Sequence, residues 1–195
     1  MKKILIVFAS NAGSTMEIAQ SLAKKLANNA TEVSVCGLKQ AQNLQTYDAI
    51  ILGAPMMREL HPGLVKYIQK NQQHLADKPV ALFITCLRLT DTRKSDFNGI
   101  PVFTDQELVR SPQNIDHMTF IERKTSFDTY LFATFESMPW FKPAQIAFFG
   151  GALNFRKLKL IQILFVLLLL QFKSVDKRNW NAIKEWSDIL QKNLY

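Results

Sequence analysis

The chain has 195 residues, of which 48% are hydrophobic, which is enough for one full core and scarcely enough for two, so we expect a single domain over residues 1–195. The formal net charge is +8, which directs the surface toward anions such as nucleic acid, acidic lipid or a carboxylated or phosphorylated small molecule. Cys36 and Cys86 are far apart and form no CxxC motif, so the cysteines favour a reduced cytoplasm over a disulfide framework.

The first element in chain order is an apolar run at residues 4–8. Lys2 and Lys3 before it imitate a signal peptide, but the run is short and leads straight into a helical pattern, so we interpret it as a buried strand. Further apolar or alternating segments predict four more strands. The five predicted strands are residues 4–8, 31–35, 49–52, 80–85 and 146–149.

Between and after these strands, apolar residues recur at helical spacing, which predicts helices. The predicted helical faces are Ile18, Leu22 and Leu26; residues 64–69 after Pro62; Phe127, Tyr130, Leu131, Phe135 and Met138; and Trp180, Ile183, Trp186 and Leu190. Alternating strands and helices predict a doubly wound α/β fold, with a parallel sheet covered on both faces. Ligands of such sheets bind at the carboxyl ends of the strands.

Residues 10–15 lie at that edge, between the first strand and the first helix. A helix amino terminus offers backbone N–H groups and a positive dipole end, Gly13 permits close approach, and Ser10, Ser14 and Thr15 supply hydroxyls. The loop therefore suits a phosphate. The alternative is that Ser10 or Ser14 only caps the helix and Gly13 only turns the chain.

The absence of their motifs argues against other kinds of phosphate-binding site. The first strand, loop and helix contain neither GxxxxGK[ST] nor GxGxxG, which argues against nucleoside triphosphates and dinucleotides. A phosphoacceptor receiver domain needs acidic residues after the first strand, where Phe8, Ala9 and Ser10 stand instead. The phosphate of a mononucleotide remains as the candidate ligand of this loop.

The loop Ser10-Asn11-Ala12-Gly13-Ser14-Thr15 resembles the first loop of the flavodoxin-like family, which reads [ST]-x-[ST/x]-G-x-T and holds the phosphate of FMN. More narrowly, the chain is similar to the menaquinone-dependent protoporphyrinogen IX dehydrogenase branch of that family. The matching features are Gly53-Ala54, His61-Pro62, Gly150-Gly151-Ala152-Leu153 and Asn179-Trp180. The resemblance covers nearly the whole chain except roughly residues 92–124, and implies a five-stranded parallel sheet with strand order 2-1-3-4-5.

The resemblance implies FMN as cofactor, with the chemistry on flavin N5 and no catalytic side chain assigned. The residues that it places around FMN are Ser10, Asn11, Ala12, Gly13, Ser14 and Thr15 in the first loop, Pro55, Met56 and Met57 in the second, and Thr85, Cys86, Leu87 and Arg88 in the third. The third loop would supply backbone donors to the pyrimidine edge, and Arg88 would favour the anionic reduced flavin. Arg58, His61 and Arg93 are candidate substrate contacts, which with Arg88 would pair with porphyrinogen propionates. Ordinary exposed cations in a basic chain are the alternative.

The second loop leaves two interpretations open, because residues 54–61 contain no aromatic residue to stack on a flavin. Met56 and Met57 either contact the flavin ring or fill the core. Cys86 has no cysteine beside it to resolve a disulfide, so we interpret it as a buried small apolar residue rather than a redox thiol. His61, His74 and His117 show no metal-ligand spacing, so we expect no metal site.

Two segments, at about residues 92–124 and 154–176, are insertions in the flavodoxin-like domain that the resemblance implies. The first mixes polar residues with scattered aromatics and is either a lid over the site or a partly mobile loop. The second holds an apolar helix at residues 158–172, too short to span a membrane and bounded by Lys157 and Lys173. It is a core helix, a homodimer face or a peripheral contact with an anionic membrane.

The sequence therefore predicts an FMN-dependent oxidoreductase that works in the cytoplasm or peripherally on the inner face of the membrane. The resemblance implies oxidation of protoporphyrinogen IX in heme biosynthesis, with electrons passed to a small-molecule or quinone redox partner and no role for nucleic acid. Two alternatives stay open: a flavodoxin-type electron carrier, and a flavin-free binding module that keeps the fold.

Overall fold

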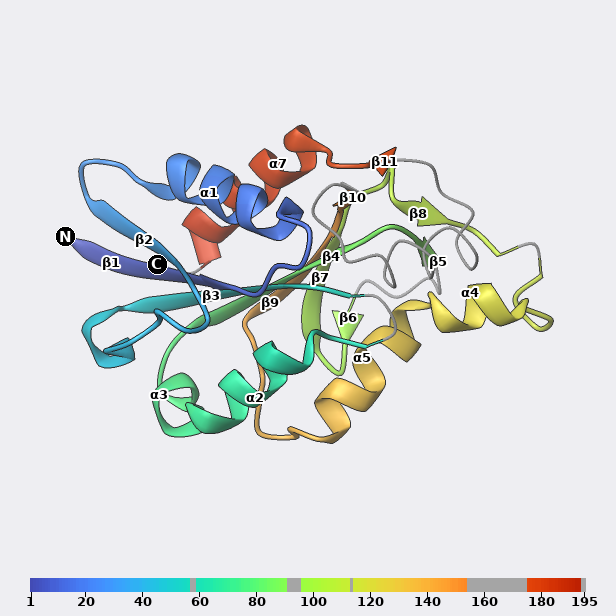
Figure 1. Cartoon of the computed structure of the whole chain (residues 1–195), viewed down its shortest axis with the longest axis horizontal. Coiled ribbons are helices and arrows are strands. Elements are labelled where there is room, and N and C mark those ends of the chain that lie inside the picture. The colour runs from blue at the N-terminus through green and yellow to red at the C-terminus, as the bar shows by residue number, and fades with distance from the viewer. Residues whose placement is uncertain (57–58, 91–95, 113, 154–174, 194–195) are drawn as a thin grey trace.

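A computed structural model gives the structure of the protein and describes residues 1–56, 59–90, 96–112, 114–153 and 175–193. These residues form a central sheet with helices on both faces (Figure 1). Its strands follow the order β2-β1-β3-β4-β9-β7-β6. They are β1 (Lys2–Phe8), β2 (Thr31–Gly37), β3 (Ala49–Pro55), β4 (Val80–Cys86), β6 (Asp96–Phe97), β7 (Ile100–Thr104) and β9 (Gln145–Gly150).

The predicted five-stranded parallel arrangement is confirmed by β2, β1, β3, β4 and β9, which are the five strands expected from the sequence. Each neighbouring pair among them is parallel. The pairings Val7↔Leu52 and Leu52↔Leu82 show the register that brings the carboxyl ends of β1, β3 and β4 to one edge of the sheet. This edge is where a doubly wound sheet binds its ligand.

The segment at residues 92–124 differs from the expected lid or loop. Its residues 96–104 form β6 and β7, which extend the sheet beyond β9, so the sheet has seven strands rather than five. The β7 strand runs parallel to β9, with Phe103 opposite Ala147, and β6 turns back antiparallel through Asn98 and Gly99, both with positive φ. The sequence did not predict these two strands, because their few aromatic residues are scattered among polar ones. Phe97 and Phe103 pack inward, while their neighbours stay exposed or half-buried.

The helices form a layer on each face of the sheet. The α1 (Ser14–Leu26) and α7 (Trp180–Asn193) helices lie together on one face, and α2 (Pro62–Lys70), α3 (Gln72–Ala76) and α5 (Phe127–Glu136) lie on the other (Figure 1). The remaining elements are short. They are the 3-10 turn Leu44–Thr46, α4 (Phe120–Lys124), β5 (Leu89–Thr90), β8 (Val109–Arg110), β10 (Ala152–Leu153) and β11 (Val175–Asp176).

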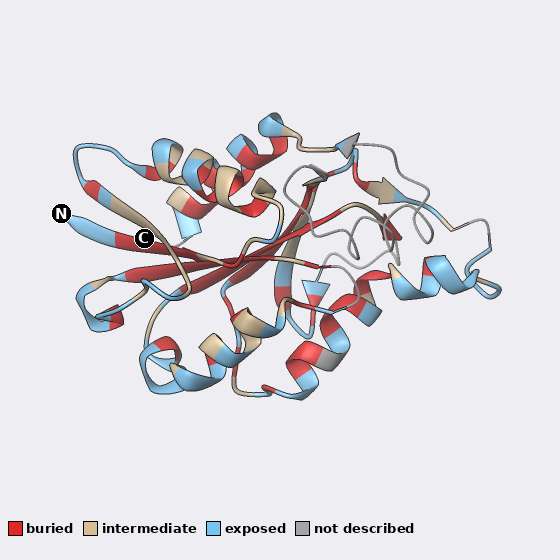
Figure 2. Cartoon of the chain, viewed as in Figure 1, coloured by how far each residue is buried: buried red, intermediate tan, exposed pale blue. Residues whose placement is uncertain are grey.

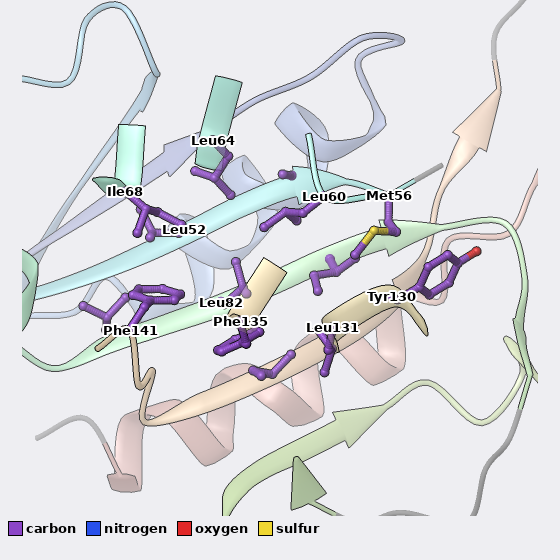
Figure 3. Packing of buried hydrophobic residues seen from close by; sticks show 14 of the residues in the cluster. Leu52, Met56, Leu60, Leu64, Ile68, Leu82, Tyr130, Leu131, Phe135 and Phe141 are labelled. Atoms are coloured by element: carbon purple, nitrogen blue, oxygen red, sulfur yellow. The ribbon is translucent and has the colours of Figure 1, made fainter. Parts of the chain in front are cut away.

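Each strand sends alternate side chains into two cores, and the central strands are buried along their length (Figure 2). On β1, Ile4 and Ile6 join the core under α1 and α7, whereas Leu5 and Val7 join the core under α2 and α5. Figure 3 shows part of the second core, where side chains from β3, β4, α2 and α5 meet. Burying each such large apolar side chain contributes about 1.5–3 kcal/mol, so these two cores supply most of the favourable free energy of folding.

The predicted helical faces are confirmed with two corrections. Met138 is fully buried as expected, but α5 ends at Glu136, two residues before it and shortly before Pro139. Trp180 lies at the start of α7 with 43% of its surface exposed, and the guanidinium of Arg178 stacks 5.1 Å from its ring centroid. The stripe of α7 therefore begins at Ile183 and continues through Trp186, whose Nε1 donates to Gln145 Oε1 at 3.1 Å.

The predicted apolar helix at 158–172 lies outside the described residues. Of the segment at 154–176, the structure describes β11, which pairs antiparallel with β10. Over the part of the chain with described coordinates, no helix combines the length and apolar character that a membrane crossing requires.

Candidate functional site

The first loop presents backbone N–H groups at the amino terminus of α1. Gly13 precedes the helix with φ 96° and ψ −20°, a left-handed conformation that favours glycine. The first helical N–H with a backbone acceptor is that of Glu17, which donates to Gly13 O at 3.1 Å. The N–H groups of Ser14, Thr15 and Met16 have no acceptor among the described residues, so three donors are available to an anion.

The alternative for this loop is wrong in its capping part, whereas the left-handed Gly13 does turn the chain. No side chain caps α1: the Ser10 hydroxyl accepts from Gly13 N at 3.0 Å and so closes the turn before the helix. A side-chain cap would have occupied a donor that the phosphate hypothesis needs. The geometry therefore favours the anion-binding interpretation of residues 10–15, with the helix dipole adding to the attraction.

The Thr15 side chain makes a contact that the sequence did not predict. Its side chain is 1% exposed, and its Oγ1 lies 2.9 Å from Thr85 Oγ1 on β4. A hydroxyl donates one hydrogen bond and accepts two, so this pair fully engages at least one donor. The contact fixes the first loop against the third, and the phosphate contact expected of Thr15 stays a prediction.

The second loop turns its apolar side chains inward. Met56 forms a bridge with Leu60, and the two side chains are 3% and 1% exposed. The N–H of Met56 donates to Thr85 O at 2.8 Å. Met56 belongs to the core under α2 and α5 (Figure 3), which favours the core interpretation for this residue, and its contact with a flavin ring stays a prediction. Pro55 is half-buried at the end of β3, and Met57 and Arg58 lie outside the described residues.

His61 is the N-cap residue of α2. Its Nδ1 accepts from Gly63 N at 3.1 Å, and Pro62 occupies the first helical position. Burial lowers the pKa of the imidazole, and the hydrogen bond requires an unprotonated Nδ1. The His-Pro pair thus has a local structural explanation, and the substrate role of His61 stays a prediction.

The carbonyl groups of the third loop are bonded within the protein. Cys86 O accepts from Gly151 N at 2.9 Å, Leu87 O accepts from Lys177 Nζ at 3.0 Å, and Arg88 O accepts from Tyr130 Oη at 3.3 Å. The loop is therefore held rigidly beside the end of β9. The flavin contacts predicted for Thr85, Cys86, Leu87 and Arg88 stay predictions, and Arg93 lies outside the described residues.

Cys86 is a buried apolar residue, as expected. It is 2% exposed and packs in the core with Met56. Burial raises the pKa of its thiol to about 12, despite the backbone N–H of Arg88 and the charge of Lys177, which lower it. At neutral pH the thiol is protonated and enclosed, so it does not act as a nucleophile.

The sequence interpretation missed the segment around Lys177, which crosses the end of β9. The Lys177 carbonyl oxygen lies 1.8 Å from where a Cβ on Gly150 would stand, and Lys177 N donates to Gly151 O at 3.0 Å. The glycine pair was the available signal, since it marks a close backbone approach. This packing explains why glycine is needed at Gly150, whereas a Cβ on Gly151 would meet only ordinary contacts, at 3.6 Å or more.

Arg178 anchors this segment to α1. Its guanidinium pairs with Asp176, with Nε donating to Oδ1 at 2.8 Å, and also with Glu17 in the first turn of the helix. The hydrogen bond from Arg178 lowers the pKa of Asp176, and the bond to Asp176 raises that of Arg178. The first loop, the third loop and residues 176–178 therefore form one connected edge.

Among the described residues, no three His, Cys, Asp or Glu side chains cluster as metal ligands do. The chemistry available at this edge is anion binding by the first loop, with Leu87 and Arg88 half-buried beside it. A phosphate group is an anion that such a helix terminus accepts.

Comparison with solved structures identifies the fold. Flavodoxin 1 from Bacillus cereus aligns with a TM-score of 0.54 and 15% identity, covering 100% of both chains. A short-chain flavodoxin associated with a bacterial microcompartment aligns with a TM-score of 0.55 and 10% identity, again over 100% of both chains. Rubredoxin oxygen:oxidoreductase from Desulfovibrio gigas aligns with a TM-score of 0.50 and 12% identity, over 100% of this chain and 36% of that one.

Sequence comparison adds the family. Curated proteins give no significant match to the chain. The family model described as the flavodoxin domain matches residues 5–177, which include the first loop, both glycines at the end of β9 and Lys177. The chain belongs to the flavodoxin family.

Proposed function

We propose that the protein binds FMN, with the phosphate held by residues 10–15, and acts in electron transfer. The observation that carries this proposal is the amino terminus of α1, where the N–H groups of Ser14, Thr15 and Met16 have no acceptor among the described residues. Members of the flavodoxin family bind FMN, whose phosphate is a dianion of the size that such a terminus accepts. When bound, FMN supplies one- and two-electron chemistry that no amino-acid side chain provides.

The residues at the edge of the sheet have distinct roles in this proposal. Gly13 aligns the phosphate donors, and the Thr15–Thr85 contact holds the first and third loops at a fixed separation. Pro55, Leu87 and Arg88 would border the ring, with buried Met56 and Cys86 behind them keeping water out. The cation of Arg88 would favour an anionic reduced cofactor, since opposite charges stabilise each other most where water is scarce.

We further propose that the substrate is anionic, and protoporphyrinogen IX with a quinone acceptor is the pair that the sequence resemblance suggests. The net charge of +8 supports an anionic partner. For each pair of electrons and protons removed from the porphyrinogen, one quinone is reduced to the quinol. Arg88 and His61, with Arg58 and Arg93 outside the described residues, are the proposed contacts for the propionates.

An electron carrier without its own substrate is the second candidate, favoured by the likeness in fold to the flavodoxins above. A flavin-free module is the third, because Met56 and Leu60 fill the core where the second loop would meet a ring. The visible spectrum of the purified protein separates the third candidate from the others: bound oxidised flavin absorbs in the blue, and a colourless protein that takes up no FMN contradicts the proposal.

An anaerobic assay then separates the enzyme from the carrier. The flavin-loaded protein should oxidise protoporphyrinogen only when a menaquinone analogue is present, with oxygen excluded because the porphyrinogen oxidises in air. Turnover supports the enzyme, and its absence in a flavin-loaded protein supports the carrier. Arg88→Ala, assayed after it has been saturated with FMN, should raise the KM for protoporphyrinogen.

Contact with an anionic membrane stays a proposal that rests on the sequence. Its basis is the apolar run at 158–172 with Lys157, Lys159 and Lys173 at its ends. Anionic liposomes should bind the protein at low salt and release it as salt screens the lysines. Equal binding at low and high salt, or none at all, would leave the core-helix and homodimer interpretations.

A further inference from the structure

The α4 helix exposes large apolar side chains that the two cores do not use. Phe120 is 68% exposed and Ile121 is 46% exposed, and Ile115, in the segment that leads into α4, is 52% exposed. Large apolar side chains that gather on one exposed surface are typical of contact with a partner or a membrane. Figure 1 shows that α4 projects at one end of the molecule, away from the two termini.

Helical geometry places two cations on the same surface. Successive residues of an α-helix are separated by about 100°, so the other residues of α4 fall within an arc of about 160° opposite Glu122. All residues of this arc are exposed, whereas Glu122 is 6% exposed. The ammonium of Lys124 lies 5.8 Å from the ring centroid of Phe120. The residues of the arc form what we name the α4 patch: Phe120, Ile121, Arg123 and Lys124.

The acidic residue of α4 is turned away from the α4 patch and is engaged in a cap. Glu122 Oε2 accepts from Thr119 N and from Thr119 Oγ1, each at 2.8 Å, and Glu122 N donates to Thr119 Oγ1 at 3.2 Å. This capping box stabilises the short helix and keeps a carboxylate off its outer surface. The exposed charges of residues 114–125 are therefore two cations, Arg123 and Lys124, against the carboxylate of Asp116.

Hydrogen bonds fix the α4 patch beside the third loop. Thr125 directly follows α4, and Thr90 lies on β5, just after the third loop. Thr90 N donates to Thr125 O at 2.8 Å, and the Oγ1 atoms of these two residues lie 2.9 Å apart. Because the patch is held in place before it meets a partner, little conformational entropy is lost on binding.

We propose that the α4 patch binds the surface of a lipid bilayer that carries anionic headgroups. Phe120 and Ile121 enter the boundary between the headgroups and the acyl chains, and Arg123 and Lys124 pair with the lipid phosphates. The charges favour this partner over a second copy of the chain, because two patches that are both positive repel each other.

The inference gives the described part of the chain a membrane contact of its own. The α4 patch shares no residue with the apolar run at 158–172, so the two contacts are tested separately. Binding through α4 would bring the neighbouring third loop close to the bilayer, where a quinone dissolves. This consequence deepens the proposed function and rests on it, whereas the membrane contact itself does not.

Vesicle sedimentation with the full chain tests the apolar part of the patch. Vesicles of phosphatidylcholine with about 30% phosphatidylglycerol should bind the parent protein at low salt, and vesicles of phosphatidylcholine alone should bind it about tenfold less. Phe120→Ser should weaken binding about fivefold or more, because an apolar contact is lost. Phe132→Ser is the matched control and should bind as the parent does, since Phe132 is 60% exposed on α5 between the acidic residues Asp128 and Glu136.

A second pair of variants tests the charges. Arg123→Gln/Lys124→Gln should weaken binding to the anionic vesicles about tenfold or more, because two cations no longer face the headgroups. Lys66→Gln/Lys70→Gln is the control, since it removes the same charge from exposed positions on α2.

The outcomes separate the patch from the other proposals. A parent protein that binds no vesicles, or losses in the patch variants that only equal those of their controls, would overturn the α4 patch even if the protein binds FMN. Patch variants that bind as the parent does, while Lys157→Gln/Lys159→Gln/Lys173→Gln loses binding, would overturn it in favour of the run at 158–172. Binding that depends on the patch in a protein that takes up no FMN would support the patch and contradict the proposed function.

Discussion

The first and second loops lie at the same edge of the sheet, but they meet a ligand with different parts of the chain. Residues 10–15 offer backbone N–H groups that have no acceptor within the described residues. The second loop directs Met56 and Leu60 into the core and donates the Met56 N–H to Thr85 O. Under the proposed function, this contrast predicts that the phosphate, rather than the ring, provides most of the affinity for FMN.

The largest expected effect in this comparison comes from Gly13→Val. A β-branched residue is strained at φ 96° by about 1–3 kcal/mol, so the loop should shift and misalign its donors. We expect FMN affinity to fall by about a hundredfold or more, measured by titrating FMN fluorescence with the apoprotein. Gly13→Asn is the control, because asparagine tolerates the left-handed region. A folded Gly13→Val protein with parental affinity would mean that residues 10–15 do not hold the phosphate.

Gly150→Ala tests whether the Lys177 segment belongs to the same edge. The new Cβ would overlap the Lys177 carbonyl oxygen at 1.8 Å, and a backbone atom cannot move aside as a side chain does. We expect a loss of about 2–3 kcal/mol in the free energy of unfolding, measured with urea. Gly151→Ala should stay within about 0.5 kcal/mol of the parent, since its nearest contacts begin at 3.6 Å. Equal effects in the two variants would contradict the packing described here.

Thr15→Val tests the contact between the first and third loops. The substitution keeps the shape but leaves the buried Thr85 hydroxyl without the partner at 2.9 Å, so stability should fall by about 1–2 kcal/mol. The double variant Thr15→Val/Thr85→Val should recover part of this loss, because no hydroxyl is then stranded. A double-mutant cycle in urea measures the coupling, and strictly additive losses would show that the two threonines act independently.

The smallest expected effect concerns pH and the second loop. The pKa of His61 is lowered below its ordinary value of 6.5, so the folded protein binds this proton less readily than the unfolded chain does. The stabilisation from the neutral cap is therefore present above pH 6.5 and is lost as pH falls through the folded pKa. His61→Asn caps without titrating, so the difference in unfolding free energy between parent and variant should shrink or reverse from pH 7.5 to about pH 5. A constant difference would exclude His61 as the titrating cap.

The sequence was sufficient to predict the elements whose structure depends on the spacing of residues close together in the chain. The five parallel strands and the faces of α1 and α7 follow from periodicity, and the first loop follows from its place between a buried strand and a helix. The position of Met56 could not be read in this way, because both the core and a flavin ring accept a thioether. Its burial depends on the bridge to Leu60, which is a property of the folded loop.

The features that the sequence did not predict depend on contacts between residues that are distant in the chain. The pairing of Thr15 with Thr85 and the approach of Lys177 to Gly150 join residues that no local pattern connects. The hydrogen bond from Lys177 Nζ to Leu87 O at 3.0 Å likewise joins two segments far apart in the sequence. Sequence spacing therefore predicted a phosphate site at the first loop but missed the contacts that tie this loop to the rest of the edge.

The added strands also change how the sheet ends. Without β7 and β6, the six residues of β9 would form an edge with a free row of backbone donors and acceptors, which invites strand pairing between molecules. Instead, the described sheet ends on this side at β6, which is two residues long and followed by a tight turn through Asn98 and Gly99. The β6 strand pairs with Ile100 and Pro101 of β7, and Pro101 has no backbone N–H to donate, so the extension replaces the highly apolar β9 as the edge by a shorter strand that contains a proline.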